Sequence, residues 1–271
     1  MNVKRRPKAL ILRTAGTNCD VETGYAFDQA GAASDRVHIN RLIENGAMLK
    51  KYSILAIPGG FSYGDDIASG KILANEIRYK LRREMNAFIR AGKIIIGICN
   101  GFQVLVKSGL LPNTSGKGGG VEASLSLNDT ARYEDRWVYL KPAAVNGRES
   151  RCVWTKGMDS VIYLPVAHAE GKFISKNSNV LNAIEEKGQV VLRYCRADGS
   201  AARGFPDNPN GSIEDIAGIC DPTGRVFGLM PHPERYITKT QHPFWTRMPA
   251  VARGDGFRIF RNGVEFASSV C

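Results

Sequence analysis

The residues in this chain best suited to covalent chemistry surround Cys99, in the segment Gly-Ile-Cys-Asn-Gly-Phe-Gln at 97–103. An apolar run at 93–96 precedes this segment, and a helix-like Val-Leu-Val follows at 104–106. The order of strand, glycine-flanked turn and helix is typical of a nucleophile elbow, which holds a strained side chain at the carboxyl edge of a sheet. A helix N-terminus behind the sulfur favours the thiolate. A buried structural cysteine explains this segment equally well, so residues elsewhere must decide.

The best candidate for a base is His232, which lies between two prolines with Glu234 two residues later. A cysteine nucleophile needs such a base and a group that orients it. In an extended segment, residues two apart project to the same side, so Glu234 can approach the imidazole and set its tautomer. A proline-rich surface turn with a stray histidine is the alternative explanation of this motif.

A third candidate element is the loop Pro-Gly-Gly-Phe-Ser-Tyr-Gly-Asp at 58–65, which follows an apolar strand. Its glycines allow the backbone to turn N–H groups into a cleft, and a tetrahedral intermediate at an acyl carbon needs such donors. The N–H groups of Gly60 and Asn100 form the natural pair, because loops after neighbouring parallel strands face one crevice. An ordinary glycine turn remains the alternative.

Two rival groups come from other loops. Cys19, in Gly-Thr-Asn-Cys-Asp at 16–20, competes as nucleophile but lacks the glycine-flanked elbow. His168 and Glu170 follow a strand and form either a rival dyad or a binding wall. The remaining cysteines are expected to be inert: Cys152, Cys195, Cys220 and Cys271.

The elements that must position these groups indicate an α/β fold. Apolar segments predict strands at 8–13, 36–39, 53–57 and 93–98, a helix capped by Asp20 and running towards Ala30, and one long helix at 71–91 that stops at Gly92. Later segments predict strands at 125–127, 137–140, 161–166, 190–194, 216–219 and 226–230, with a turn at 221–224. We therefore expect a doubly wound, mostly parallel sheet flanked by helices, with an added antiparallel section. The absence of a repeat or long linker predicts one domain over 1–271, on which the tail at about 236–271 docks.

Composition narrows the class of protein. The 271 residues are 43% hydrophobic and 23% charged, a normal balance for a soluble chain with a substantial core. The formal charge of +11 would suit nucleic acid, nucleotides or an acidic partner. We expect no nucleic-acid binding, because no basic patch with interleaved aromatics is found. One predicted helix instead carries its cations on a solvated face: Lys80, Arg82, Arg83 and Arg90.

Other classes of site are also not expected. No apolar run is long enough for a membrane span, and the basic N-terminus lacks the features of a secretory signal, so we expect a cytoplasmic protein. Six scattered cysteines form no Cys-x-x-Cys pair, and the four histidines show no zinc spacing with them. The sequence therefore predicts no metal site.

Taken together, the ordered motifs resemble the class I, or triad-type, glutamine amidotransferases, in which Pro-Gly-Gly, Gly-x-Cys-x-Gly-x-Gln and a late His-Pro-Glu follow one another. The flanking sequences at 16–20, 58–65, 97–103, 168–171 and 228–235 are similar to those of one subfamily, the glutaminase subunits of phosphoribosylformylglycinamidine synthase in purine biosynthesis. The resemblance extends over nearly the whole chain and implies a flavodoxin-like fold.

The resemblance implies roles for individual residues. Cys99 would attack the carboxamide carbon of L-glutamine, His232 would transfer protons, and Glu234 would orient His232. The backbone amides of Gly60 and Asn100 would hold the oxyanion, and Gln103 would lie near the substrate. No cofactor is expected in this chain, because ATP and Mg²⁺ would bind the large synthetase subunit that receives the ammonia, often in a complex with a small third protein.

Some features depart from the pattern of the subfamily. The run after Asp65 differs from that of many members, and the chain has additional residues around 113–150 and a tail after Arg235. These differences affect the expected contacts with partners and leave the three catalytic candidates untouched. Two alternatives remain open: an amidotransferase subunit of another pathway, and a non-catalytic basic subunit that binds or scaffolds.

Overall fold

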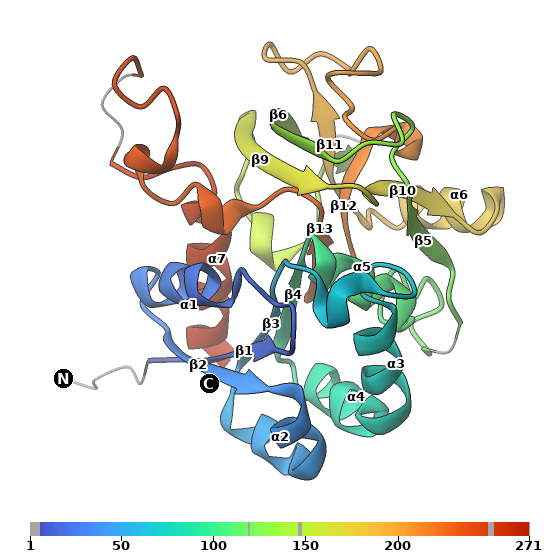
Figure 1. The fold of residues 1–271 in the computed structure, drawn as a ribbon, viewed down its shortest axis with the longest axis vertical. Helices are drawn as coiled ribbons and strands as arrows, with labels where there is room; N and C mark the ends of the chain where they lie inside the picture. Colours follow the sequence, from blue (N-terminus) through green and yellow to red (C-terminus); the bar gives the residue numbers. More distant parts are fainter. Residues whose placement is uncertain (1–5, 119, 146–147, 249–251, 271) are drawn as a thin grey trace.

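The computed structural model describes residues 6–118, 120–145, 148–248 and 252–270, which are built around one large sheet (Figure 1). The nine strands of this sheet lie in the order β2 (Ala33–His38), β1 (Lys8–Arg13), β3 (Ile54–Ile57), β4 (Ile94–Ile98), β13 (Val226–Leu229), β12 (Ile216–Cys220), β11 (Val190–Cys195), β6 (Glu134–Pro142) and β9 (Ile162–His168). The first five strands are parallel, and every pairing from β13 to β9 is antiparallel. This confirms the predicted mostly parallel sheet with an antiparallel section.

The centre of the sheet is β4, which is buried along its whole length between β3 and β13. A strand covered on both faces has no polar side and reads as a continuous apolar run, as the isoleucines of β4 do. Because β3 and β4 are parallel neighbours, the loops after Ile57 and Ile98 leave the sheet at the same edge. That edge carries two of the predicted functional loops.

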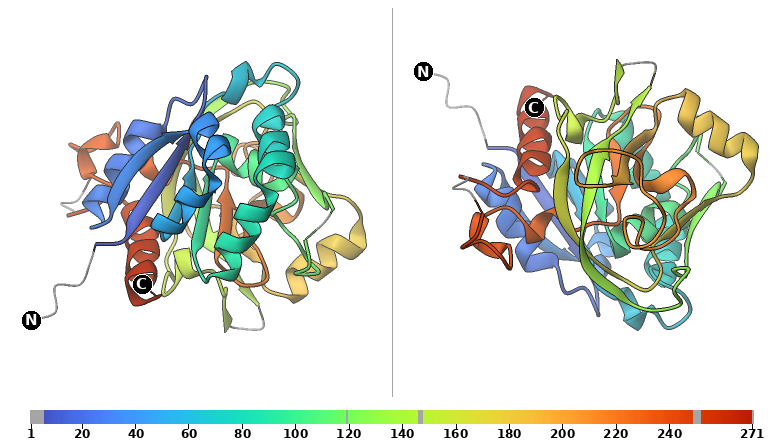
Figure 2. Two further views of the ribbon diagram at one scale, coloured as in Figure 1. Left: turned by 90° about the horizontal axis from the view of Figure 1, so that it is seen from below. Right: turned by 90° about the horizontal axis from the view of Figure 1, so that it is seen from above.

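Helices cover both faces of the parallel half (Figure 2). α1 (Asp20–Gln29) and α7 (Phe257–Val270) lie on one face, where the Phe27 and Phe260 rings meet edge to face with centroids 5.0 Å apart. α3 (Lys71–Lys80), α4 (Arg82–Arg90) and α5 (Asn100–Lys107) lie on the other face. Aromatic pairs of this geometry add to the hydrophobic stabilisation, so α7 in the tail is docked on the fold.

The predicted single helix at 71–91 is wrong, because the chain breaks at Leu81 (φ −123°, ψ 6°) into α3 and α4. Its apolar stripe recurs mostly every fourth residue, and four residues advance about 40° beyond one helical turn. Along a straight helix the stripe would turn away from the core. The break restores the contact and leaves Leu81 buried. The predicted cationic face is therefore divided between two helices.

Several element boundaries also differ from the prediction. The first helix is capped by Cys19, and Asp20 is its first helical residue. The second strand starts at Ala33 and ends at His38, where the unpredicted α2 (Ile39–Glu44) begins with the His38 ring accepting the Asn40 N–H at 3.2 Å. A side-chain cap of this kind satisfies an otherwise unpaired helix N–H.

The remaining elements surround the antiparallel half. α6 (Ser178–Glu186) was not predicted, and two small sheets pair β5 (Ala123–Ser126) with β10 (Lys172–Ser175) and β7 (Ala144–Val145) with β8 (Arg148–Glu149). Short 3-10 segments connect the elements at η1 (Gly46–Lys51), η2 (Ser62–Asp65), η3 (Val153–Thr155), η4 (Ile213–Asp215), η5 (Pro233–Arg235) and η6 (Lys239–Gln241). No helix formed by the described residues has the length and apolar character needed to cross a membrane.

The predicted turn at 221–224 joins β12 and β13 as an antiparallel hairpin. The Asp221 carboxylate accepts the N–H groups of Arg225 and Val226 at 2.9 Å each, the local bonding that favours Asp in turns. β13 therefore returns beside β4, and the segment after it reaches the edge where the Cys99 turn lies.

Candidate active site

Cys99 lies in the sharp turn between β4 and α5, with φ 51° and ψ −106°. A left-handed φ is strained for a residue with a side chain and is held only by its surroundings. Glycines provide those surroundings: a Cβ on Gly101 would lie 1.8 Å from the Ile57 carbonyl oxygen, and one on Gly97 would lie 2.5 Å from the Gly101 oxygen. The elbow predicted from the sequence is therefore present, and its thiol lies 3.7 Å from the Ala167 carbonyl oxygen.

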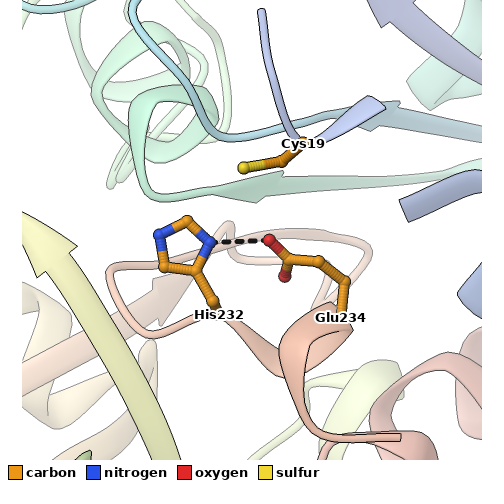
Figure 3. A group of neighbouring side chains, drawn as sticks. All are labelled: Cys19, His232 and Glu234. Atoms are coloured by element: carbon orange, nitrogen blue, oxygen red, sulfur yellow. Dashed lines mark hydrogen bonds and ion pairs between the residues drawn. The ribbon is translucent and has the colours of Figure 1, made fainter. Parts of the chain in front are cut away.

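His232 and Glu234 form a buried pair in the segment that follows β13. The imidazole Nδ1 lies 2.6 Å from Glu234 Oε1, and the two side chains are 2% and 0% exposed (Figure 3). The extended conformation predicted for residues 232–234 is wrong. Pro233 instead starts the 3-10 turn η5, and that turn brings the carboxylate back towards the ring. The contact is as predicted, but the backbone conformation that produces it is different.

The environment of His232 favours its protonated form. Burial alone lowers the pKa of a histidine, but the Glu234 carboxylate and then the Cys99 sulfur outweigh burial and raise the pKa of His232 well above its usual value. The second ring nitrogen, Nε2, is buried and has no hydrogen-bond partner among the described residues. A ring held at Nδ1 by a carboxylate presents Nε2 for proton transfer, as the base of a catalytic triad does.

The loop after β3 approaches the elbow through Gly60, which has φ +133°. A Cβ on Gly60 would lie 2.7 Å from the Asn18 nitrogen and 2.8 Å from the Gly16 oxygen, so only glycine fits here. The Phe61 N–H donates to the Gly16 oxygen at 2.9 Å. The segment before α1 therefore holds the predicted oxyanion loop in place.

The side chain of Asn100 ties this loop to the elbow. Its Nδ2 donates to Asp65 Oδ1 at 3.1 Å and to Gln103 Oε1 at 3.0 Å, and its Oδ1 accepts the Ser62 N–H at 3.3 Å. Gln103 Nε2 in turn donates to the Glu170 backbone oxygen at 2.5 Å. A buried amide with all of these partners rigidifies its surroundings.

A cavity of about 220 Å³ connects three of the predicted residues: Gly60, Cys99 and Gln103 all line it. Sequence reasoning did not assign two further lining side chains, Tyr133 and Asp65, to the site. Tyr133 lies in the segment at about 113–150, where no local motif identifies it as a site residue. Asp65 ends the motif at 58–65, and an acidic side chain directly after a glycine turn is the signal that could have identified it.

Cys19, the rival nucleophile, lies against the same histidine. A Cβ on Gly59 would lie 2.7 Å from His232 Cε1 and 3.1 Å from Cys19 Sγ, so the ring and the sulfur share this contact. The sulfur also accepts an N–H of Arg235 at 3.2 Å. Burial raises the pKa of Cys19 to about 11, which outweighs the lowering by His232. Cys19 is thus held as a thiol, and it does not line the cavity beside Cys99.

His168 and Glu170 have separate partners, which does not support the rival dyad. His168 Nδ1 lies 3.1 Å from Asn128 Oδ1, while Glu170 forms an ion pair of 3.5 Å with Lys107. Burial, and then the charge of His232, lower the pKa of His168 to about 3. A neutral histidine that lines the cavity fits the alternative of a binding wall.

Three of the other cysteines, Cys152, Cys195 and Cys220, are buried and free and do not line the cavity. Cys271 falls outside the described residues.

Comparison with known proteins adds independent findings. The family model described as CobB/CobQ-like glutamine amidotransferase domain matches residues 6–267. The chain is 48% identical over 263 residues to the phosphoribosylformylglycinamidine synthase subunit PurQ of Dehalococcoides mccartyi, covering 97% of this chain and 98% of the relative. It is 42% identical over 275 residues to the subunit of the same name from Methanococcus maripaludis, covering 97% and 98%.

The fold is also similar to solved structures. A chain in the structure of PurLQS from Thermotoga maritima has a TM-score of 0.70 and 28% identity, covering 96% of this chain and 99% of that one. A glutamine amidotransferase from the same organism, at 14% identity and a TM-score of 0.51, covers 90% and 82% and shows the fold alone.

Proposed function

This chain belongs to the CobB/CobQ-like glutamine amidotransferase family, and from that premise we propose that it is the glutaminase subunit of phosphoribosylformylglycinamidine synthase. It hydrolyses L-glutamine and delivers the ammonia to a separate synthetase subunit. The observation that carries this assignment is the near full-length similarity, at 48% and 42% identity, to relatives that bear that subunit name.

The proposed catalytic residues are Cys99, His232 and Glu234. His232 Nε2 accepts the proton of the Cys99 thiol while the sulfur attacks the carboxamide carbon of glutamine. The pair of electrons displaced from the carbonyl moves to its oxygen, where the N–H groups of Gly60 and Asn100 stabilise the negative charge. The strained turn at Cys99 and its place on the wall of the cavity support this role.

Collapse of this intermediate breaks the carbon–nitrogen bond. His232 returns its proton to the departing nitrogen, which leaves as ammonia, and a γ-glutamyl thioester remains on Cys99. A water molecule then attacks the thioester, His232 takes its proton, and glutamate leaves as the proton returns to the sulfur. The raised pKa of His232 suits a group that must hold a proton between these steps.

Glu234 has a positioning and electrostatic role in this proposal. Its 2.6 Å contact with Nδ1 orients the ring and stabilises the imidazolium. Gln103, which lines the same cavity and is fixed by Asn100 and Glu170, contributes to the wall that receives glutamine.

The wider assignment follows from the family. We propose that the chain needs no cofactor of its own and that ATP and Mg²⁺ bind the synthetase subunit, in a complex that often contains a small third protein. The continuous sheet and the docked α7 support a single domain over 1–271. We also propose that the protein is cytoplasmic, because it supplies ammonia to an enzyme of nucleotide synthesis.

Reconstitution with the synthetase subunit of the same organism tests the assignment. We expect the wild-type chain to support formation of formylglycinamidine ribonucleotide from glutamine, and Cys99→Ala to abolish it while ammonium still supports the partner. Cys195→Ser, which alters a buried cysteine outside the site, is the matched control. Full glutamine-dependent activity in Cys99→Ala would contradict the catalytic role. Ammonium-supported synthesis that glutamine never supports would contradict the pathway.

A further inference from the structure

Three buried groups of different chemistry meet beside Nδ1 of His232, on the opposite edge of the ring from Nε2. Cys19 Sγ, an imidazole nitrogen of His232 and a carboxylate oxygen of Glu234 all lie within 4.8 Å of one another. Their residues are 1%, 2% and 0% exposed. In Figure 3 the Cys19 side chain lies next to the dashed contact between His232 and Glu234. A thiol, an imidazole and a carboxylate therefore converge on one point.

This donor set suits zinc. Zn²⁺ binds cysteine sulfur, histidine nitrogen and carboxylate oxygen, commonly with three protein ligands and one water or substrate molecule. We propose that Cys19, His232 and Glu234 form a binding site for Zn²⁺ and that an ion bound there inhibits the glutaminase. The binding claim is independent of the proposed function, whereas the claim of inhibition rests on it.

The charges at the site balance when the ion is bound. A Cys19 thiolate and the Glu234 carboxylate together neutralise Zn²⁺, and the adjacent Arg235 is already paired with Glu22 at 3.0 Å. The guanidinium repels a cation, but its N–H at 3.2 Å from Cys19 Sγ also stabilises the thiolate that binds the cation. The second carboxylate oxygen, Glu234 Oε2, is buried and has no hydrogen-bond partner among the described residues.

Only a small movement is needed to admit the ion. Nδ1 and Oε1 are 2.6 Å apart, whereas ligand distances of about 2.0–2.1 Å around zinc require them to separate to roughly 3 Å. The ion therefore takes the place of the proton between Nδ1 and Oε1, the neutral ring then carries its proton on Nε2, and the thiol proton of Cys19 is released to solvent.

The inhibition follows from the tautomer of the ring. A neutral imidazole that binds a metal through Nδ1 carries its proton on Nε2. That nitrogen is then a donor and cannot accept the proton of Cys99. An ion on the Cys19 side thus blocks the first proposed step without touching the nucleophile.

Cobalt is the probe that separates this site from a simpler one between Cys99 and Nε2. We expect Co²⁺ added to Cys99→Ala to give the charge-transfer absorption of a cobalt–thiolate bond. The double variant Cys19→Ser/Cys99→Ala should lose that absorption. Serine keeps the size of the side chain and a hydroxyl that can bond to Asn18 Oδ1, the present acceptor of the thiol at 3.1 Å.

Another thiol pair provides the matched control. Cys152 and Cys220 are hydrogen-bonded neighbours away from His232 and could themselves bind a thiophilic ion. Cys152→Ser/Cys99→Ala should therefore keep the absorption. An absorption that requires Cys152 and persists without Cys19, or no absorption in Cys99→Ala, would overturn the proposal.

Zinc inhibition of the reconstituted complex tests the consequence. The rate of each variant with zinc is compared with its own rate without zinc. We expect Cys19→Ser to raise the half-inhibitory Zn²⁺ concentration at least about tenfold, which corresponds to a loss of about 1.4 kcal/mol in the free energy of zinc binding. Binding should weaken about tenfold per unit as the pH falls, because one thiol proton is displaced. An unchanged half-inhibitory concentration would refute inhibition through Cys19. Because the cobalt measurement needs no activity, it remains decisive even if the chain has another function.

Discussion

The Cys99 turn and the Cys19 loop place two buried cysteines against one histidine, yet only the Cys99 turn has the strained geometry of the proposed nucleophile elbow. Cys99 has a left-handed φ of 51° between glycines and faces the cavity, whereas Cys19 caps α1 with an ordinary φ of −101°. The thiol of Cys19 donates a hydrogen bond to Asn18 Oδ1 and accepts one from Arg235. On the proposed roles, contact with a base is insufficient, because a nucleophile also needs access to the substrate and oxyanion donors.

The largest expected difference is in covalent labelling. A glutamine-analogue electrophile should modify Cys99 almost exclusively, because Cys19 does not line the cavity and a thiol with a pKa of about 11 is only about one part in a thousand thiolate near pH 8. Peptide mapping of the adduct measures the ratio. Preferential modification of Cys19 would reverse the comparison and make the N-terminal loop the catalytic element.

Neutralising Glu234, the carboxylate that contacts His232, should have a smaller effect, on the rate of glutamine hydrolysis. Glu234→Gln should lower kcat for glutamine hydrolysis about 10²–10⁴-fold with a smaller change in KM, since the carboxylate no longer stabilises the imidazolium. Glu22→Gln changes a half-exposed carboxylate that pairs with Arg235 on the Cys19 side, and is the matched control. The assay is glutamate release by the complex. Equal losses in the two variants would show that the two sides of the histidine are equivalent.

The smallest effect concerns the pH dependence of Cys19 itself. In Cys99→Ala, alkylation of Cys19 should accelerate about tenfold per pH unit up to its pKa of about 11, because deprotonation produces the reacting thiolate. Burial also raises the pKa of Cys195 to about 11, so the same digest contains a second cysteine expected to show this slope. A rate for Cys19 that is already constant at neutral pH would mean that His232 and Arg235 stabilise its thiolate more than burial disfavours it.

The parallel half of the fold is largely predictable because its signals are local. β1 has the predicted bounds of Lys8–Arg13, and β4 lies within its predicted run, since buried parallel strands are short and continuously apolar. The break at Leu81 was not predictable in the same way. Lys80 to Arg82 contain no proline or glycine, and the interruption coincides with a change of packing partner, because α3 packs mainly on α5 whereas α4 contacts η1 and β4.

The antiparallel half and the tail were harder to predict. Strands there are recognisable one by one, but the pairing of β6 with both β9 and β11 is a long-range arrangement that no turn residue specifies. α7 was expected only as docked structure, because its burial depends on α1, which lies more than 200 residues earlier.

By itself, the sequence determined the local chemistry of the site: a cysteine between glycines, a glycine loop, and a histidine followed by an acid. These motifs are short, and steric demands that act within a few residues explain them. Only the tertiary structure decided which groups meet. It places Cys19 in contact with His232, although more than 200 residues of chain separate them. It also brings the Glu234 carboxylate to the imidazole ring through a 3-10 turn. The physical reason is that sheet order and helix docking, which bury apolar surface across the whole chain, set these distances.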